Sequence, residues 1–383
     1  MHEPDDLFSP AHYAAVRRPV GEASNLPTWC YTSKRFFDRE IDRLFGKVWN
    51  FVGRTDRISK PGDFFTCEAA TVPLIIARGA DGVARAFGNT CRHRGCAVAK
   101  GEGNARTFIC PYHAWTYSNE GRLVGAPTDM DASVGFDKKD YSLIEVRLES
   151  WGGFMFVNLD SSAPSLAEHL GNLPELLAPY DCASMVTGRR VEFDVPCNWK
   201  FYVENLKDAQ HVTTVHKNSI SSYAPVGKFW RGIQETQGNL VSTYMGYPKS
   251  AMIFPTDTGF APIPGLDMAN AGTTAPLVFP NLYISCTTDG AWYIHVNPVA
   301  PDRMKLEQGA LFPAESLARA DRDEILPRYF RRLDMTQAED NEICALQHQG
   351  VNSPLSSPGR YSTKEALVHR THNWILDRVL EPQ

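Results

Sequence analysis

The sequence has no long hydrophobic run. The apolar stretch at residues 72–77, VPLIIA, is far shorter than the ~20 residues that a transmembrane helix needs. The N-terminus, MHEPDDLFSP, is acidic and polar, so we expect no signal peptide. These two absences predict a cytoplasmic protein that makes no contact with a membrane.

Neither sign of charge dominates, and cysteine is sparse. The chain carries 39 lysine and arginine residues against 44 aspartate and glutamate residues, which gives no reason to expect nucleic-acid binding. Nine cysteines, an odd number scattered over 383 residues, do not form a disulfide framework. Without internal repeats or low-complexity tracts, this composition indicates a globular protein, and its length suits about two domains.

Three parts of the chain differ in pattern. Residues 1–45 include a helical segment with a possible N-cap at Thr32 or Ser33. Residues 46–160 contain short β runs punctuated by glycine and proline, which predicts a small all-β domain. Residues 161–383 alternate helices and strands, and we expect residues 252–274, rich in glycine, proline and threonine, to form a long irregular loop. The fold class is therefore expected to be α+β.

Two short boxes stand at predicted strand ends of the all-β part. The first, CRHRG, begins at Cys91 and includes His93; the second, CPYH, runs from Cys110 to His113. A zinc finger usually keeps like ligands paired, whereas each box here supplies one cysteine and one histidine. A Rieske [2Fe–2S] cluster needs two thiolates on one iron and two imidazoles on the other. Two loops that clamp such a cluster would each give one ligand to each iron; zinc is the alternative.

These motifs resemble the Rieske non-haem iron oxygenases, the ring-hydroxylating family, in their catalytic alpha subunit, and the resemblance covers nearly the whole chain. It implies a small all-β Rieske domain and a helix-grip catalytic domain of the START/Bet v1-like type, with a curved antiparallel sheet round a long helix. In respiratory-chain Rieske proteins a cysteine placed like Cys96 forms a disulfide with the second box, where this chain has Tyr112. We therefore expect Cys96 to be a small buried residue and the cluster potential to be low, roughly -150 mV.

A second cluster, ENLKDAQHVTTVHK, contains His211 and His216. Five residues separate them, about 140° round a straight helix, so a regular helix cannot aim both at one metal. The helix must bend, bulge or end between them if they share an ion. Two unrelated histidines on a polar helix are the alternative, which the neighbouring Rieske motif makes much weaker.

Two histidines need a carboxylate to form the facial triad of a non-haem iron site. Asp340 lies on the same predicted helix face as Ile343 and Cys344, and a carboxylate on a buried face needs a partner or a metal. Glu339 lies about 100° away round the helix and is expected to meet solvent. The family places its ligating aspartate in a similar Glu-Asp context, which also favours Asp340. A capping or salt-bridged acid is the alternative, and zinc could fill the site but has no redox chemistry.

The resemblance gives Asp208 a role as well. It matches the acid that links the Rieske domain of one subunit to the iron of the next, bonded to His113 of the neighbour and to His211. Asn205, one turn earlier, is either part of the iron pocket or a simple helix residue. Some relatives with quaternary-ammonium substrates carry glutamate at the position of Asp208, so aspartate weakly favours another substrate.

The expected function is the terminal oxygenase component of a multicomponent Rieske mono- or dioxygenase. It would use O2 and NADH-derived electrons, delivered by a flavin and iron–sulfur reductase or a ferredoxin, to hydroxylate an aromatic or other small organic compound, as in aromatic hydrocarbon catabolism. The resemblance implies a homotrimer. Oxidative N- or O-demethylation of a quaternary ammonium or methoxy compound is the alternative reaction. A Rieske electron carrier without oxygenase activity is the alternative of another class.

Several side chains could contact the substrate, but each has a structural alternative. Lys228 and Arg231 could hold a substrate carboxylate, although surface charge is the simpler interpretation, and His295 more plausibly makes a structural hydrogen bond. The aromatic and methionine side chains that could line a pocket or belong to the core are Phe229, Trp230, Tyr244, Met252, Phe254, Phe260 and Tyr283.

Overall fold

The computed structural model describes residues 3–127, 130 and 133–380. By internal contacts the chain divides into a small unit, Gly46–Leu166, and a large unit formed by Met1–Phe45 and Ala167–Gln383. The second division falls a few residues after the expected limit at residue 160. The N-terminal segment therefore belongs to the same compact unit as the C-terminal half.

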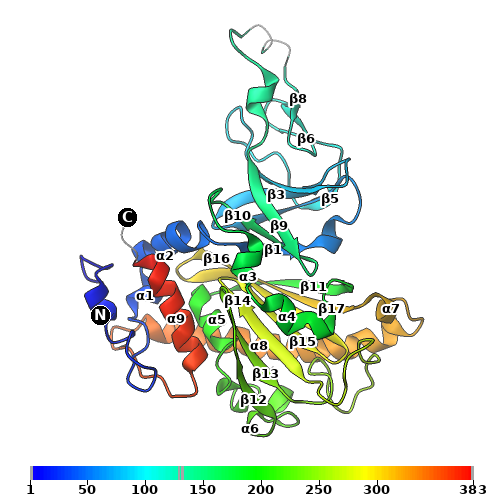
Figure 1. Ribbon diagram of the computed structural model, residues 1–383. Coiled ribbons are helices and arrows are strands. Elements are labelled where there is room, and N and C mark those ends of the chain that lie inside the picture. Colours follow the sequence, from blue (N-terminus) through cyan, green and yellow to red (C-terminus); the bar gives the residue numbers. More distant parts are fainter. Residues whose placement is uncertain (1–2, 128–129, 131–132, 381–383) are drawn as a thin grey trace. The chain divides into compact units, whose positions relative to one another are not determined.

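The small unit is built from β-strands (Figure 1). Its larger sheet is antiparallel, in the order β1-β10-β9-β4-β3-β2-β5, and a second sheet has the order β6-β7-β8. The strands are β1 (Asn50–Arg54), β2 (Asp63–Ala69), β3 (Val72–Arg78), β4 (Ala84–Gly88), β5 (Glu102–Asn104), β6 (Thr107–Ile109), β7 (Thr116–Ser118), β8 (Leu123–Gly125), β9 (Glu145–Trp151) and β10 (Phe154–Asn158). Its described residues also include the 3-10 turns η3 (Thr55–Ile58) and η5 (Lys138–Tyr141).

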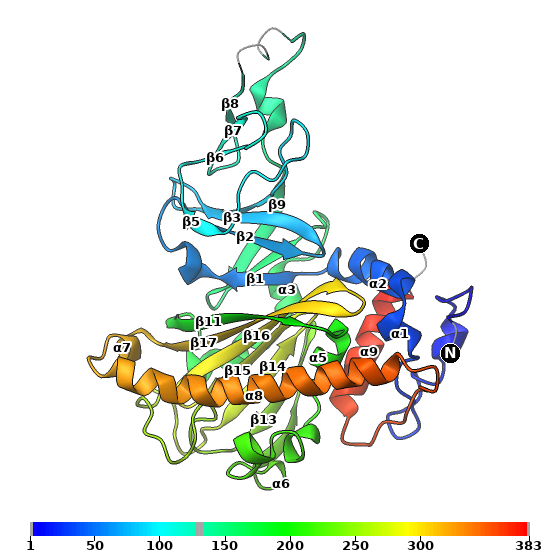
Figure 2. The same ribbon diagram turned by 180° about the vertical axis from the view of Figure 1, so that it is seen from behind.

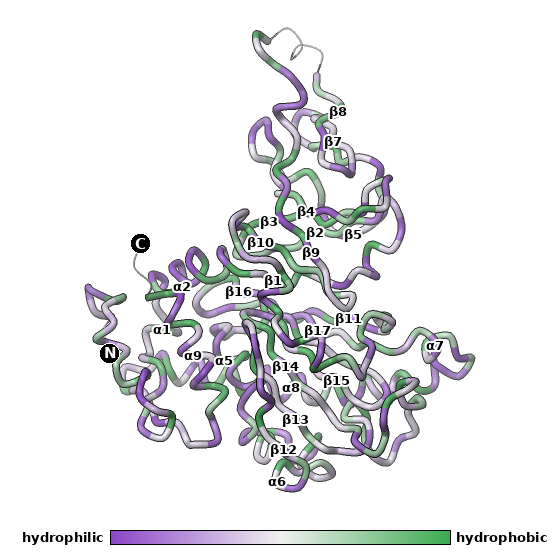
Figure 3. The backbone as a smooth tube through the Cα atoms, viewed as in Figure 1, coloured by the Kyte–Doolittle hydropathy of each residue, from purple (hydrophilic) through white to green (hydrophobic). Residues whose placement is uncertain are grey.

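The large unit contains one seven-stranded antiparallel sheet in the order β11-β17-β16-β15-β14-β13-β12. Its strands are β11 (Met185–Val195), β12 (Trp230–Gln234), β13 (Leu240–Met245), β14 (Thr273–Val278), β15 (Leu282–Thr287), β16 (Gly290–Ala300) and β17 (Arg303–Pro313). Residues 246–272, between β13 and β14, form no helix or strand, which agrees with the irregular loop expected there. Both hydrophobic and hydrophilic residues occur along the strands of this sheet (Figure 3).

Helix α8 (Arg322–Val351) crosses one face of this sheet along its length (Figure 2). Asp323 and Glu324 lie in its first turn, where the helix dipole favours negative charge, and Pro327 sits near the start, as expected. The remaining helices and turns of the large unit are η1 (Pro10–Tyr13), α1 (Trp29–Thr32), α2 (Lys34–Glu40), η2 (Ile41–Phe45), α3 (Leu166–Leu170), α4 (Leu173–Leu177), η6 (Ala178–Tyr180), α5 (Trp199–Asn205), η7 (His211–Thr213), η8 (Lys217–Ser221), α6 (Val226–Phe229), α7 (Ala314–Leu317) and α9 (Ala366–Val379). A curved antiparallel sheet with a long helix, beside a separate all-β unit, confirms the predicted α+β fold.

The N-terminal helices are joined to α5 by buried contacts. Ser33 is the N-cap of α2, because its hydroxyl accepts a hydrogen bond from the Phe36 amide at 3.2 Å. Lys200 of α5 forms an ion pair of 2.7 Å with Glu40, and both side chains are fully buried. A buried charge pair is costly to break, since either partner alone would be an uncompensated charge. These contacts fix the helix that leads into the second metal site.

Candidate metal centres and substrate cavity

The two Cys/His boxes of the small unit form turns of the same kind. In the first, the amide of Gly95 donates to the carbonyl of Cys91 at 2.9 Å; in the second, the amide of Ala114 donates to the carbonyl of Cys110 at 3.0 Å. Gly95 and Ala114 both have positive φ, 76° and 56°, which closes each turn tightly. The boxes follow β4 and β6, so the sheets present two equivalent loops to one site.

The four expected cluster ligands fit a [2Fe–2S] group. Cys91 and Cys110 are free thiols with only 3% of their surface exposed, and the rings of His93 and His113 lie 4.9 Å apart. Nδ1 of His113 is buried and no described residue hydrogen-bonds it. Buried polar atoms are normally paired, so this nitrogen and two buried thiols point to a metal group as their partner. The ring of Trp115 stacks on His93 at 5.0 Å and holds that imidazole in place.

Tyr117 contacts the first box at the expected cluster site. Its hydroxyl lies 3.3 Å from Sγ of Cys91 and accepts from the amide of Arg92 at 3.0 Å. Burial raises the pKa of the Tyr117 phenol, so it remains a hydrogen-bond donor to the sulfur. Such a hydrogen bond raises the reduction potential of a [2Fe–2S] cluster. The expectation of a low potential did not include this effect. Cys96 is partly buried rather than buried, and its thiol faces the carbonyl of Ala97.

The second site lies beyond the end of α5. The helix ends at Asn205, His211 begins the 3-10 turn η7, and His216 directly precedes the π turn η8. The regular helix therefore ends before the two histidines, which meets the condition that the sequence set for a shared ion. Their rings lie 5.1 Å apart.

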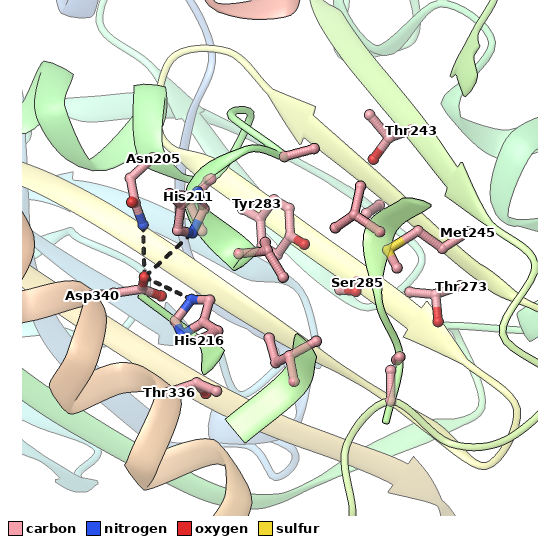
Figure 4. A pocket seen from close by; sticks show the side chains of 18 of the residues that line it. Asn205, His211, His216, Thr243, Met245, Thr273, Tyr283, Ser285, Thr336 and Asp340 are labelled. Carbon is pink, nitrogen blue, oxygen red and sulfur yellow. Dashed lines mark hydrogen bonds and ion pairs between the residues drawn. The ribbon is translucent and has the colours of Figure 1, made fainter. Parts of the chain in front are cut away.

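Asp340 completes the cluster from α8 (Figure 4). Its Oδ1 is 3.0 Å from Nε2 of His216 and 3.7 Å from Nε2 of His211. One ligand atom from each of the three residues lies within 4.8 Å of the others. Two imidazoles and a carboxylate at this spacing fit one divalent ion with coordination positions left open on one side. Asn205 points to the same place, and its amide donates to Oδ1 of Asp340 at 2.8 Å.

Each histidine is oriented by a partner on its other nitrogen. His216 contacts the carboxylate of Glu339 through Nδ1 at 2.7 Å, and Ser219 donates to the same oxygen. The expectation that Glu339 meets solvent is therefore wrong, because the π turn places His216 and Ser219 beside it. Burial lowers the pKa of His216, but the hydrogen bonds and charges of Asp340 and Glu339 raise it above its usual value. A bound metal would replace the proton on Nε2.

Asp208 caps the turn that carries His211. Its carboxylate accepts from the amides of Gln210 at 2.8 Å and His211 at 3.2 Å, and its carbonyl accepts from Nδ1 of His211. The carboxylate itself is 3.8 Å from Nδ1, so the direct bond from the imidazole goes to the backbone. Burial lowers the pKa of His211, more than the nearby charges of Asp340 and Asp208 raise it.

Asp208, His211 and Asn205 each line two cavities. The second cavity is also lined by residues of α1, α9 and the segment before α9, and it includes Glu204 and His372. Asp208 can therefore be reached from the second cavity as well as from the first.

The first cavity has a volume of about 150 Å³ and begins at the metal-ligand cluster. That is the size of cavities that hold a single benzene ring. Figure 4 shows Asp340, His211 and His216 at one end, Thr243, Met245 and Thr273 at the other, and Tyr283 between them. The aromatic side chains in its wall are Tyr223, Trp230, Tyr247, Tyr283 and Trp292.

Two basic residues that the sequence did not single out also line this cavity, Lys207 and Arg332. Nζ of Lys207 donates to the carbonyl of Ala275 and lies 4.8 Å from the Tyr283 ring centroid. Burial lowers its pKa to about 7. Arg332 lies on α8 eight residues before Asp340, a spacing that puts both on one helix face and could have identified it.

The other substrate candidates divide between cavity and core. Trp230 and Tyr283 line the cavity. Lys228 and Arg231 are exposed and lie outside it, so the simpler interpretation of surface charge holds. The remaining positions are core or cavity neighbours: Met252 and Phe260 belong to a buried cluster, Phe229 and Phe254 contact Tyr247 and Tyr223, Tyr244 lies in another pocket, and His295 bonds Asn281.

Known proteins resemble this chain over half or nearly all of its length. The glycine betaine monooxygenase oxygenase subunit of Pseudomonas aeruginosa (strain UCBPP-PA14) is 26% identical over 407 residues, which cover 98% of this chain and 94% of that protein. The biphenyl 2,3-dioxygenase subunit alpha of Rhodococcus jostii (strain RHA1) is 34% identical over 204 residues, 51% of this chain and 44% of that protein. The structure of naphthalene 1,2-dioxygenase from Rhodococcus sp. bound to indole has a TM-score of 0.81 at 21% identity, covers 99% of both chains, and supports the fold alone.

Among the described residues, no helix combines the length and the apolar character that a membrane span requires. Residues 48–135 match the Rieske [2Fe-2S] domain, and residues 182–381, more than half of the chain, match the ring hydroxylating alpha subunit (catalytic domain). The cofactors are therefore a Rieske cluster and a mononuclear iron, and the enzyme acts on an organic substrate with O2 and an electron-donating reductase or ferredoxin. The chain belongs to the family of ring-hydroxylating Rieske oxygenases, as the catalytic alpha subunit and terminal oxygenase.

Proposed function

We propose that His211, His216 and Asp340 hold the mononuclear iron and that the enzyme hydroxylates a small, largely apolar substrate in the adjoining cavity. The observation that carries this is that the three ligand atoms lie within 4.8 Å of one another in the wall of that cavity. When bound, the mononuclear iron supplies the redox centre at which O2 is activated, and the cluster supplies the electrons. Cys91, His93, Cys110 and His113 are proposed as the cluster ligands.

The surrounding residues hold the ligands in their reactive form. Glu339 accepts a hydrogen bond from Nδ1–H of His216, and the carbonyl of Asp208 accepts one from Nδ1–H of His211. The lone pair of each Nε2 is then free to face the metal. Asn205 donates to Asp340 and orients its carboxylate. The aromatic and aliphatic wall keeps bulk water from the substrate face, which protects the reacting centre from side reactions.

We also propose that electrons reach the iron across a subunit boundary. In a homotrimer, Asp208 would connect His113 of a neighbouring subunit to His211, and its access from the second cavity supports this role. Co-expression of His113→Ala and His216→Ala variants tests this route, because each variant alone lacks one of the two metal sites and should be inactive. Random mixing makes about three-quarters of rings mixed, each with one intact junction of three, so about one-quarter of wild-type activity should return. Activity at background in mixed rings confirmed by mass would contradict this route.

Oxidative demethylation of a quaternary ammonium compound is the second candidate. It is favoured by the relative that acts as a glycine betaine monooxygenase and by the aromatic rings of the cavity, which suit a cation–π contact. Formaldehyde release separates the two reactions, because ring hydroxylation produces none. We further propose a cytoplasmic location, which the odd number of scattered cysteines in the sequence favours.

The test of the function is a substrate panel with a surrogate NADH-dependent reductase. The proposal predicts substrate-dependent O2 uptake and a product whose mass includes oxygen from 18O2. If the protein accepts electrons but consumes no O2 with any substrate, it acts as an electron carrier and the proposal fails. The number of labelled oxygen atoms in the product separates mono- from dioxygenation.

A further inference from the structure

Arg332 is a buried charge in the wall of the substrate cavity. Only 2% of its surface is exposed, and it lies on α8 among the residues that line the cavity. Its Nε donates to the hydroxyl of Tyr223 at 3.2 Å, and its guanidinium carbon lies 5.6 Å from the ring centroid of Trp292. These contacts hold the side chain in place but supply no negative charge.

The guanidinium has unused hydrogen-bonding capacity. It carries five N–H groups, and no described residue accepts from the four on its two terminal nitrogens. Within the described part of the chain, no carboxylate forms an ion pair with Arg332, although the adjacent Arg331 pairs with Asp257 at 2.6 Å. Burying an ionised group without a counter-charge costs several kcal/mol, so this arginine needs a counter-charge that the described residues do not supply.

The charges of the cavity are unequally placed. Its acidic residues, Asp208 and Asp340, belong to the metal-ligand end, whereas Arg332 lies two helical turns from Asp340 along α8. A rise of 1.5 Å per residue separates the two Cα atoms by about 12 Å. That span suits a molecule of about one ring and a short chain, with an anionic group at Arg332 and an apolar part toward the metal end.

A planar guanidinium binds a planar carboxylate through two parallel hydrogen bonds, and one permanent positive charge balances one negative charge. A cation without an anionic group would instead meet repulsion at this end of the cavity. The competing explanation is that Trp292 and Tyr223 alone accommodate the charge for structural reasons, in which case the cavity would show no preference for anions.

We propose that the substrate of this enzyme is a small organic carboxylate whose carboxylate group pairs with Arg332. This inference rests on the proposed function for the identity of the cavity as the substrate site. Arg332 is then a specificity-determining residue, and Tyr223 is its positioning residue. The apolar body of the substrate lies between Arg332 and the His211, His216 and Asp340 cluster.

The test measures binding, so that it is independent of turnover. Isothermal titration of the iron-loaded enzyme compares benzoate, phenylacetate and 3-phenylpropanoate with their matched primary amides. At least one carboxylate should bind the wild-type protein tenfold or more tightly than its amide, because a charged hydrogen-bonded pair is lost with the amide. Choline, a cation without a carboxylate, should bind more weakly than that acid.

Variants assign the preference to Arg332. In Arg332→Gln the carboxylate should lose its advantage over the amide, and in Arg332→Lys it should keep part of it. Arg331→Gln removes the same charge one residue away, from a side chain that is 61% exposed, and should leave the preference unchanged. Iron content and cluster absorbance establish that each variant is intact, and the wild-type comparison stands even if Arg332→Gln does not fold.

Two results would overturn the inference. One is equal binding of acids and amides by the wild-type protein. The other is a carboxylate preference that survives in Arg332→Gln, which would mean that the metal or Lys207 holds the acid. Oxygen uptake with the same compounds separates this test from that of the function. Acids that bind through Arg332 but are not oxygenated would leave the inference standing and count against the proposed reaction. Oxygenation restricted to neutral or cationic compounds would count against the inference and leave the proposed reaction standing.

Discussion

The cluster site of the small unit and the metal-ligand cluster of the large unit differ most in their surroundings. In the small unit the two thiols are buried, but His93 and His113 are partly exposed and Tyr112, inside the second box, is 54% exposed. In the large unit His216 and Asp340 are 3% and 8% exposed. An electron carrier has to be approached by its partners, so its ligands can lie on surface turns. A site that oxidises a substrate must enclose it, and the ligands then belong to a cavity wall.

Replacement of Asp208 by asparagine tests whether the two sites are connected as proposed. Asparagine is also a good N-cap, so the turn of His211 should persist and both metals should bind. Loss of the bridging carboxylate should lower turnover more than about 100-fold. Iron analysis and steady-state O2 uptake measure the two effects. Loss of the mononuclear iron from this variant would instead show that Asp208 is a metal ligand and not a bridge between the two sites.

Burial in the large unit also has an electrostatic effect at Asp289, in the turn between β15 and β16. Burial raises its pKa to about 6, against an ordinary value of 3.8, although Tyr329 donates a hydrogen bond to it. The folded state therefore binds more protons between these two values, and stability falls as the pH rises through this window. The penalty is absent below about pH 4 and complete above about pH 6.

Asp289→Asn should therefore raise the melting temperature above pH 6, by the equivalent of about 3 kcal/mol at most, with a smaller gain at pH 5. Asp323→Asn, at an exposed position with 85% of its side chain accessible, is the matched control and should show no such trend. Thermal denaturation between pH 5 and 8 measures both. A gain that does not change with pH would contradict the electrostatic cause.

Glu339→Gln probes how the enclosed site holds its metal. Glutamine cannot carry the negative charge that polarises His216, so iron affinity should fall roughly tenfold while the cluster is unaffected. Iron retention during dialysis against a chelator measures this affinity. Glu342→Gln, an exposed position on the same helix, serves as the control. Equal retention in both variants would show that Glu339 does not support the ligand.

Tyr117→Phe makes the corresponding change at the cluster. Removal of a hydrogen bond worth about 1 kcal/mol from Cys91 should lower the reduction potential by about 40 mV, because the bond stabilises the more negative reduced state. Potentiometric titration followed by cluster absorbance measures this. An unchanged potential would mean that the hydroxyl bonds only the Arg92 amide.

The sequence predicts candidate ligands most directly where they lie close together in the chain. The boxes at Cys91 and Cys110 fall within one small sheet unit, so their spacing predicts a shared site. The interval between His211 and His216 likewise predicts that the helix must be interrupted. The prediction of Asp340 needed its helix face and the Glu-Asp context of the family, because α8 reaches the site through packing on the sheet.

Glu339 could not be placed in this way, and for Arg332 the spacing from Asp340 indicates the helix face but not the burial of the charge. The direction of Glu339 depends on the π turn at η8, which brings Ser219 and His216 to it and has no clear signal in the sequence. The burial of Arg332 depends on the rings of Trp292 and Tyr223, which come from a strand and a loop far from it in the chain. Both are tertiary effects that local spacing does not encode.

The most direct test of two separate metal sites is an iron and acid-labile sulfide count on three proteins. The wild-type chain should contain three irons and two sulfides, as a [2Fe–2S] cluster plus one ion requires. Asp340→Ala should contain two irons and two sulfides with its cluster absorbance intact. Asp334→Ala, which removes a half-exposed acid from the same helix, should match the wild type. Stoichiometric zinc without sulfide, or three irons retained in Asp340→Ala, would contradict the account.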